Sequence, residues 1–279
     1  MWRVRKPTVS AEESFETCIS RIRNADLKQR MEEIADSVIA AAEAYDTAAG
    51  VAQLHGIAAQ SDVDGSVTAK EMTRLYDGRM VAAKSPGRGI YDALIASAEH
   101  GRCPFCGHRV VSTLDHILPK AHYPVFAVSP CNLVPSCADC NKTKHDQPLV
   151  DATDQYIHPY YDEIEGELWL KAEILETTPA SVRFFVESVE GWPDILGHRV
   201  ESHFKRLGLS KLYSSQAAQE LVSIRHQVAA LHGRLGAEGV KQFLKECHAS
   251  RAHVRINSWQ TAIYAALAES DWYCDGGFA

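Results

Sequence analysis

Several features are missing from this 279-residue sequence, and each absence excludes a class of protein. No apolar run approaches the roughly 20 residues that a membrane-spanning helix needs. The first residues, 1–7, are not followed by the apolar segment of a signal peptide. There is no low-complexity tract and no internal repeat. We therefore expect a cytoplasmic globular protein, with one large or two modest domains and no membrane association.

A positive net charge is also missing. The chain has 29 lysine and arginine residues against 36 aspartate and glutamate residues, which gives a net charge of −7. Such a chain does not attract nucleic acid through its overall field. The charges are unevenly spread, however: residues 154–190 carry nine acidic and two basic side chains, and residues 199–255 carry ten basic and four acidic ones. The second stretch is consistent with a basic groove or, equally, with solvated helix faces.

The strongest pattern that is present is a pair of C-x2-C motifs, at Cys103 and Cys106 and at Cys137 and Cys140. Together they offer four thiolates, the set that suits a tetrahedral zinc ion. Residues 107–136 separate the two motifs, a wider spacing than usual, so we expect folded structure between them. Disulfides or metal-free buried thiols are the alternative, but the reduced thiols of a cytosolic protein favour a metal. Cysteines without such spacing are expected to be small buried hydrophobic residues: Cys18, Cys131, Cys247 and Cys274.

A second group of polar residues lies inside this frame. Asp115 and His116 are adjacent in a short predicted strand, where neighbouring side chains point to opposite faces, so one would face a cation and the other a substrate. A neutral imidazole is a good general base for water. Asn141 and His145 are four residues apart in a predicted helix, so both could bind one ion, with Mg²⁺ or Mn²⁺ suited to these ligands. The amide of Asn132 would brace the loop between strand and helix and orient the histidine.

In this order the residues resemble the HNH endonucleases, whose ββα-metal core is often framed by a zinc ribbon. The resemblance covers about a sixth of the chain and rests on the cysteine pairs, Asp-His, Asn-Leu and Cys-Asn-x2-Lys. It implies that His116 is the general base and that Asp115 is a metal ligand. It further implies that Asn132 orients the loop of the base and that Asn141 is the metal ligand early in the helix.

The resemblance also extends to residues near the end of that helix. Some HNH members, such as colicin-type nucleases, have a further ligand one turn later, where His145 stands. Lys144 matches a lysine that contacts a phosphate in many members, and Lys142 is a second candidate for binding nucleic acid. A weaker resemblance links the Asp-His-x-x-Pro-Lys and Asn-Leu-x-x-x-Cys spacing to HNH effectors of bacterial anti-phage systems such as Septu. It implies an ATPase partner protein.

The sequence therefore predicts an α+β, mainly helical fold with a central ββα-metal core. We divide it into a helical region at 1–98, a nuclease core with zinc knuckles at 99–150 and a mostly helical α+β region at 151–279. The expected function is phosphodiester hydrolysis in nucleic acid, with double-stranded DNA favoured, using structural Zn²⁺ and catalytic Mg²⁺ or Mn²⁺. The alternative is a zinc-ribbon module that binds nucleic acid or protein without cleavage. Periodicity predicts helices at 68–81, 200–207, 214–233, 240–247 and 259–269, and strands at 167–176 and 181–188.

Overall fold

The computed structural model describes residues 1–144, 149 and 151–279. The chain forms two compact units, Met1–Asp162 and Glu163–Ala279. Helices dominate both, and the sheets are two-stranded. No helix within the described parts of the chain combines the length and the hydropathy needed to cross a bilayer. The predicted fold class, α+β and mainly helical with a small ββα core, is confirmed, whereas the proposed functional division at 1–98, 99–150 and 151–279 stays a prediction.

The first unit begins with helices whose starts are fixed by polar caps. The Ser10 side chain accepts a hydrogen bond from the Glu13 amide, and Asn24 caps the following helix in the same way. Thr68 and Glu71 form a capping box. The helices of this unit that precede the ββα core are α1 Ala11–Ile19, α2 Ala25–Glu33, α3 Ala35–Gly50, α4 Ala69–Leu75, continued by a π-helical turn at Tyr76–Val81, and α5 Arg88–Ala96. A small hairpin of β1 Asp62–Val63 and β2 Val67–Thr68 precedes α4.

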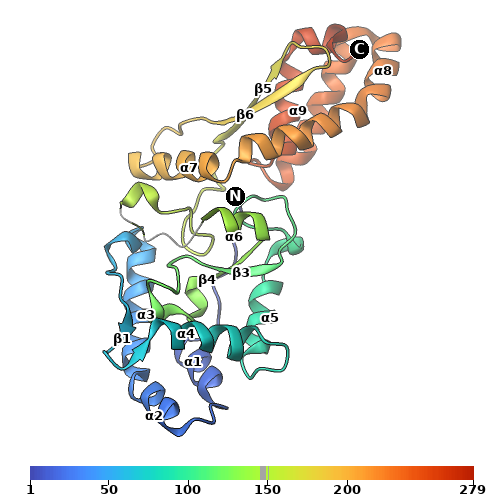
Figure 1. The fold of residues 1–279 in the computed structure, drawn as a ribbon. Coiled ribbons are helices and arrows are strands. Elements are labelled where there is room, and N and C mark those ends of the chain that lie inside the picture. The colour runs from blue at the N-terminus through green and yellow to red at the C-terminus, as the bar shows by residue number, and fades with distance from the viewer. Residues whose placement is uncertain (145–148, 150) are drawn as a thin grey trace. The chain divides into compact units, whose positions relative to one another are not determined.

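The centre of this unit is a ββα arrangement. Strand β3 (Thr113–His116) pairs antiparallel with β4 (Leu133–Ser136), and helix α6 (Ala138–Lys144) follows directly. The register places Asp115 opposite Val134 and His116 opposite Leu133. Helix α5 packs against both strands, and α6 packs against β3 (Figure 1). Two helices therefore support the hairpin, which fixes the residues at its end.

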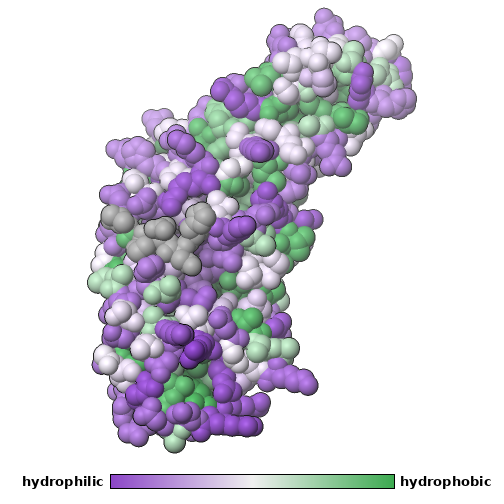
Figure 2. Space-filling view, viewed as in Figure 1, coloured by the Kyte–Doolittle hydropathy of each residue, from purple (hydrophilic) through white to green (hydrophobic). Residues whose placement is uncertain are grey.

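Apolar burial holds the ββα core to the N-terminal helices. Phe15 of α1 and Tyr45 of α3 are almost fully buried, and the Tyr45 ring contacts Phe126 at a centroid distance of 5.2 Å. The Ser14 hydroxyl donates to the Val128 carbonyl at 2.7 Å. Both contacts reach the connection between β3 and β4. On the side shown in Figure 2, most of the surface of each unit is hydrophilic, with smaller apolar areas between.

The second unit is a two-stranded sheet covered by long helices. Strands β5 (Leu170–Leu175) and β6 (Ser181–Val186) are antiparallel. Helix α8 (Leu209–Val254) packs on β6, and α9 (Trp259–Glu269) packs on β5. Asn257 fixes the start of the sheet, because its side-chain oxygen accepts hydrogen bonds from the amides of Trp169 and Leu170. The helices are α7 Asp194–Arg206, α8 Leu209–Val254 and α9 Trp259–Glu269, followed by a π-helical turn at Tyr273–Gly277.

The prediction of separate helices at 214–233 and 240–247 is confirmed, because a non-helical residue separates two helices there. Both lie within α8, which is interrupted at Gly236, where the backbone has φ 68° and ψ −168°. That conformation is open almost only to glycine. The sequence pattern located the interruption but overestimated its length, because a single glycine can redirect a helix without a loop.

Candidate active site and zinc site

The four cysteines of the two C-x2-C motifs come together in the first unit. All four are buried, and their sulfur atoms lie within 4.8 Å of one another. In a tetrahedral site with Zn–S distances of about 2.3 Å, the sulfur atoms would be about 3.8 Å apart. The cluster therefore fits a zinc ion with modest adjustment. The wide spacing is explained by the β3–β4 connection, which lies between the two motifs.

Backbone turns hold the sulfur atoms in place. The Arg109 amide donates to the Cys106 sulfur and the Cys140 amide donates to the Cys137 sulfur, each at 3.4 Å. The first turn also needs Gly107, which has φ 59°; a Cβ atom there would lie 2.6 Å from the Trp2 indole nitrogen. Each C-x2-C motif thus forms a tight turn that presents its sulfur atoms to one point.

Two of the four thiols have lowered pKa values, and the other two have raised ones. A hydrogen bond with Cys103 is the main cause that lowers the pKa of Cys137 to about 7 and that of Cys106 well below its usual value. Interaction with Cys106 raises the pKa of Cys103, and interaction with Cys103 raises that of Cys140. Four thiolates in a buried cluster repel one another, so a central cation is needed for all four to ionise together. The cluster suits a structural metal better than four free thiols.

A polar pocket of about 320 Å³ lies at the end of the β3–β4 hairpin. Asp115 and His116 from β3, Asn141 and Lys142 from α6, and Lys120 from the following loop all line it. The expectation that Asp115 and His116 would serve two separate faces needs correction, because both border this pocket. They lie at the end of β3, where the strand stops and the chain turns into the connecting loop. The pocket thus collects three of the five predicted catalytic residues, Asp115, His116 and Asn141.

His116 is held in one tautomer. Its Nε2 atom lies 2.9 Å from the carbonyl oxygen of Ala127, and because a carbonyl can only accept, Nε2 must carry the proton. The Nδ1 atom of the neutral ring is then the acceptor. Burial, with the charge of Lys120 next in size, lowers the pKa of His116 to about 3. The ring is therefore neutral at physiological pH.

Asn132 organises the loop that carries this carbonyl. It is fully buried, its side-chain oxygen accepts from the Leu118 amide at 2.8 Å, and its amide nitrogen donates to the carbonyls of Leu118 and Phe126. Phe126 immediately precedes Ala127. Asn132 thus fixes both ends of the loop that positions the imidazole, and it does not line the pocket itself.

Asp115 is paired with Lys144. The Lys144 Nζ atom is 2.8 Å from Oδ2 of Asp115, and both side chains are about 5% exposed. The two atoms are at ion-pair distance without the alignment of a hydrogen bond. Lys144 also lies over the rings of Phe105 and Tyr156. This burial places Lys144 behind the carboxylate, whereas Lys142, two residues earlier, is exposed at the pocket.

Sequence reasoning did not identify two residues of the pocket, Tyr76 and Lys120. The Tyr76 and His116 rings meet edge-on, with their centroids 4.6 Å apart. The Lys120 Nζ atom lies 5.1 Å from the centroid of the Tyr76 ring. Lys120 is part of the Asp-His-x-x-Pro-Lys spacing, a signal that could have marked it. Tyr76 lies in the π-helical turn after α4 and carries no motif. His145, the predicted additional ligand, lies outside the residues that the structure describes.

Comparison with known proteins places this site in a family. Residues 103–147 match the sequence profile of the family described as HNH endonuclease. The chain is 32% identical over 230 residues to Protein ea31 of Escherichia phage lambda, an alignment that covers 77% of each chain. No solved structure matches the chain. The chain belongs to the same family as Protein ea31, and its residues 103–147 are an HNH endonuclease domain.

Proposed function

We propose that this protein is a metal-dependent endonuclease that hydrolyses phosphodiester bonds in nucleic acid, with double-stranded DNA as the substrate. The observation that carries the proposal is the pocket that combines a neutral histidine, a carboxylate, an amide and two lysines. The Asp115 charge is already balanced by Lys144, so Lys120 and Lys142 leave the pocket a surplus of positive charge. That surplus suits an anionic phosphate, even in a chain with a net charge of −7.

His116 acts as the general base in this proposal. Its Nδ1 atom accepts a proton from the attacking water, while its Nε2–H stays on the Ala127 carbonyl. An imidazole with a pKa of about 3 is always available as an acceptor near pH 7 but is a weak base. A phosphate bound in the pocket would raise that pKa, because a nearby negative charge favours the imidazolium form. The Tyr76 ring packs edge-on against the imidazole and limits its rotation.

Asp115 and Asn141 are the residues that would hold the catalytic cation, Mg²⁺ or Mn²⁺. Both line the pocket beside His116, and carboxylate and amide oxygens suit these ions. The ion would neutralise negative charge that develops on the phosphate and the leaving oxygen. Lys144 balances the charge of the Asp115 carboxylate and orients it, a position that counts against a direct phosphate contact by Lys144. Ligation by His145, a role in anti-phage defence and an ATPase partner stay predictions.

The competing function is a zinc-ribbon module that binds nucleic acid without cleaving it. Relaxation of supercoiled plasmid by purified protein in Mg²⁺ or Mn²⁺ separates the two functions. We expect the wild-type protein to nick the plasmid and His116→Ala to lose at least about 100-fold in rate, the usual contribution of a general base. No cleavage of any nucleic acid by the wild type would support the binding module, whereas equal cleavage rates for the two proteins would contradict His116 as the general base.

A further inference from the structure

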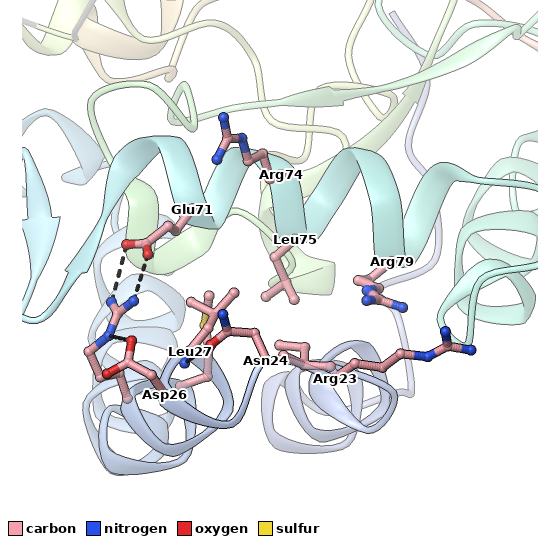
Figure 3. Close-up of a pocket in the computed structure, with 11 residues that line it drawn as sticks. Arg23, Asn24, Asp26, Leu27, Glu71, Arg74, Leu75 and Arg79 are labelled. Carbon is pink, nitrogen blue, oxygen red and sulfur yellow. Dashed lines mark hydrogen bonds and ion pairs between the residues drawn. The ribbon is translucent and has the colours of Figure 1, made fainter.

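A second pocket of about 480 Å³ lies in the first unit, between residues 22–31 and residues 71–79 (Figure 3). Its lining is rich in arginine, which no motif of the nuclease core accounts for. Four arginines and two carboxylates border it, so the pocket lining carries a net charge of +2: Arg23, Arg30, Arg74 and Arg79, with Asp26 and Glu71. In a chain whose net charge is −7, this is a local reversal of sign.

One arginine, Arg30, pairs with both carboxylates. Arg30 contacts the two oxygens of Glu71 at 2.8 and 3.3 Å and Oδ2 of Asp26 at 3.1 Å. The hydrogen bond from Arg30 is the largest cause that lowers the pKa of Glu71 to about 2. The pair with Glu71 also ties α2 to α4, as the dashed lines in Figure 3 show, whereas the pair with Asp26 lies within α2. The shape of the pocket is therefore fixed by contacts that leave its other arginines uninvolved.

Those other arginines are available to a ligand. Arg23 and Arg74 are exposed and Arg79 is half-buried, and none forms an ion pair with a carboxylate within the described part of the chain. A guanidinium group matches a phosphate with two parallel N–H donors, and phosphates take most of the hydrogen bonds that proteins make to nucleic acid. Arg23 and Arg79 lie beside the hollow and Arg74 extends from the other side of α4, so the basic groups around this helix favour a polyanion over a neutral ligand.

The position of the pocket connects it to the site of His116. A single helical run, α4 and its π-helical continuation, lines both pockets, because Tyr76 borders the His116 pocket while Arg74 and Arg79 border the arginine pocket. The two arginines are two residues before and three residues after Tyr76, within about 5 Å along a helix axis. Figure 3 shows Arg74 extending to the opposite side of α4 from Leu75. One strand of a duplex has a phosphate about every 3.4 Å along its axis, a spacing comparable to that of these three residues along the helix.

We propose that Arg23, Arg74 and Arg79 bind the sugar–phosphate backbone of the nucleic acid whose scissile phosphate enters the His116 pocket. The inference rests on the proposed nuclease function and adds a binding surface outside the HNH domain. It also explains how an acidic chain holds a polyanion, because the attraction is confined to the region around α4. The basic stretch at 199–255, suggested by the sequence, is not required for this contact.

The test compares two double variants with the same change in net charge. Arg74→Gln with Arg79→Gln removes two pocket arginines, and Lys70→Gln with Lys84→Gln removes two exposed lysines of the same region that do not line the pocket. Binding of a labelled duplex of about 25 base pairs is measured by anisotropy between about 50 and 200 mM salt, in a His116→Ala background that prevents cleavage. Circular dichroism melting checks that both variants are folded.

We expect the arginine variant to lose about tenfold or more in affinity and the slope of log K against log salt to fall by about 2. The lysine control should stay close to the parent protein. Equal affinity and slope for the two double variants, or no binding by the parent protein at the lowest salt, overturns the arginine surface. If the arginines govern binding but the wild-type chain cleaves nothing, the surface stands and the nuclease proposal fails.

Discussion

The ionisation of His116 distinguishes the folded from the unfolded chain near neutral pH. Its pKa is about 3 in the folded protein, against an ordinary value of 6.5, because burial disfavours the imidazolium. The unfolded chain therefore takes up a proton first as the pH falls. Stability from this residue is present above about pH 6.5 and is lost progressively as the pH falls from 6.5 towards 3.

The pH dependence of unfolding tests this environment. Between pH 7 and pH 5, without added divalent cation, the wild-type protein should lose about 1–2 kcal/mol more of its unfolding free energy than His116→Gln. The glutamine variant cannot titrate, whereas all other groups are shared and cancel in the difference. Urea denaturation at the two pH values measures it. Identical pH dependence in the two proteins would mean that His116 is not held as a buried neutral ring.

Lys144 and Lys142 provide a matched pair on one helix. Removing Lys144 leaves the Asp115 carboxylate buried without its cation, and Lys144→Met should cost about 3–5 kcal/mol of stability. Lys142 is exposed, so Lys142→Met should change stability by less than about 0.5 kcal/mol. Urea denaturation near pH 7 compares them. A mild effect of Lys144→Met, similar to that of the control, would show that the pair is solvated in solution.

At the residue scale, the sequence predicted the members of the site whose spacing is local. The two C-x2-C motifs, the adjacent Asp115 and His116, and Asn141 one residue after Cys140 could all be found without a structure. Tyr76 could not, because it reaches the pocket only through the packing of α4 and its continuation below the hairpin. The burial of Lys144 was missed for the same reason, since it depends on Phe105 and Tyr156 from distant parts of the chain.

At the scale of elements, helix α8 shows which features the sequence pattern alone can predict. Periodicity predicted an interruption near its middle, and two glycines in that region have opposite roles. Gly236 has φ 68°, which an alanine adopts only with strain, whereas Gly233 lies in regular helix with no atom within 4 Å of an added Cβ. Propensity alone cannot separate the two, because both read as helix breakers.

Alanine substitutions at these glycines should therefore have opposite signs. Gly233→Ala should stabilise the second unit by up to about 1 kcal/mol, because alanine is the better helix former. Gly236→Ala should destabilise it by about 1–3 kcal/mol through backbone strain. Thermal unfolding followed by circular dichroism measures both. If both substitutions stabilise, α8 is continuous in solution and the interruption at Gly236 is not an intrinsic feature.

At the scale of the whole molecule, loss of the metal should affect one compact unit and leave the other folded. The cysteine cluster lies in Met1–Asp162, so loss of zinc should unfold the ββα core and leave α8 and α9 helical. Cys140→Ser should abolish the expected zinc content of about one ion per chain and raise hydrogen exchange in the first unit alone. Cys131→Ser, outside the cluster, is the control. Full protection of the core in zinc-free Cys140→Ser would contradict a structural metal.

The central claim is that the His116 pocket hydrolyses phosphodiester bonds with a divalent cation held by Asp115 and Asn141. The most direct test is the cleavage rate of duplex DNA as a function of Mn²⁺ concentration, for wild type, Asp115→Ala, Asn141→Ala and His116→Ala at equal zinc content. We predict that the residual activity of the two ligand variants rises with Mn²⁺, because weakened binding can be restored by mass action, while His116→Ala stays inactive throughout. Cleavage by His116→Ala at the wild-type rate would contradict the account.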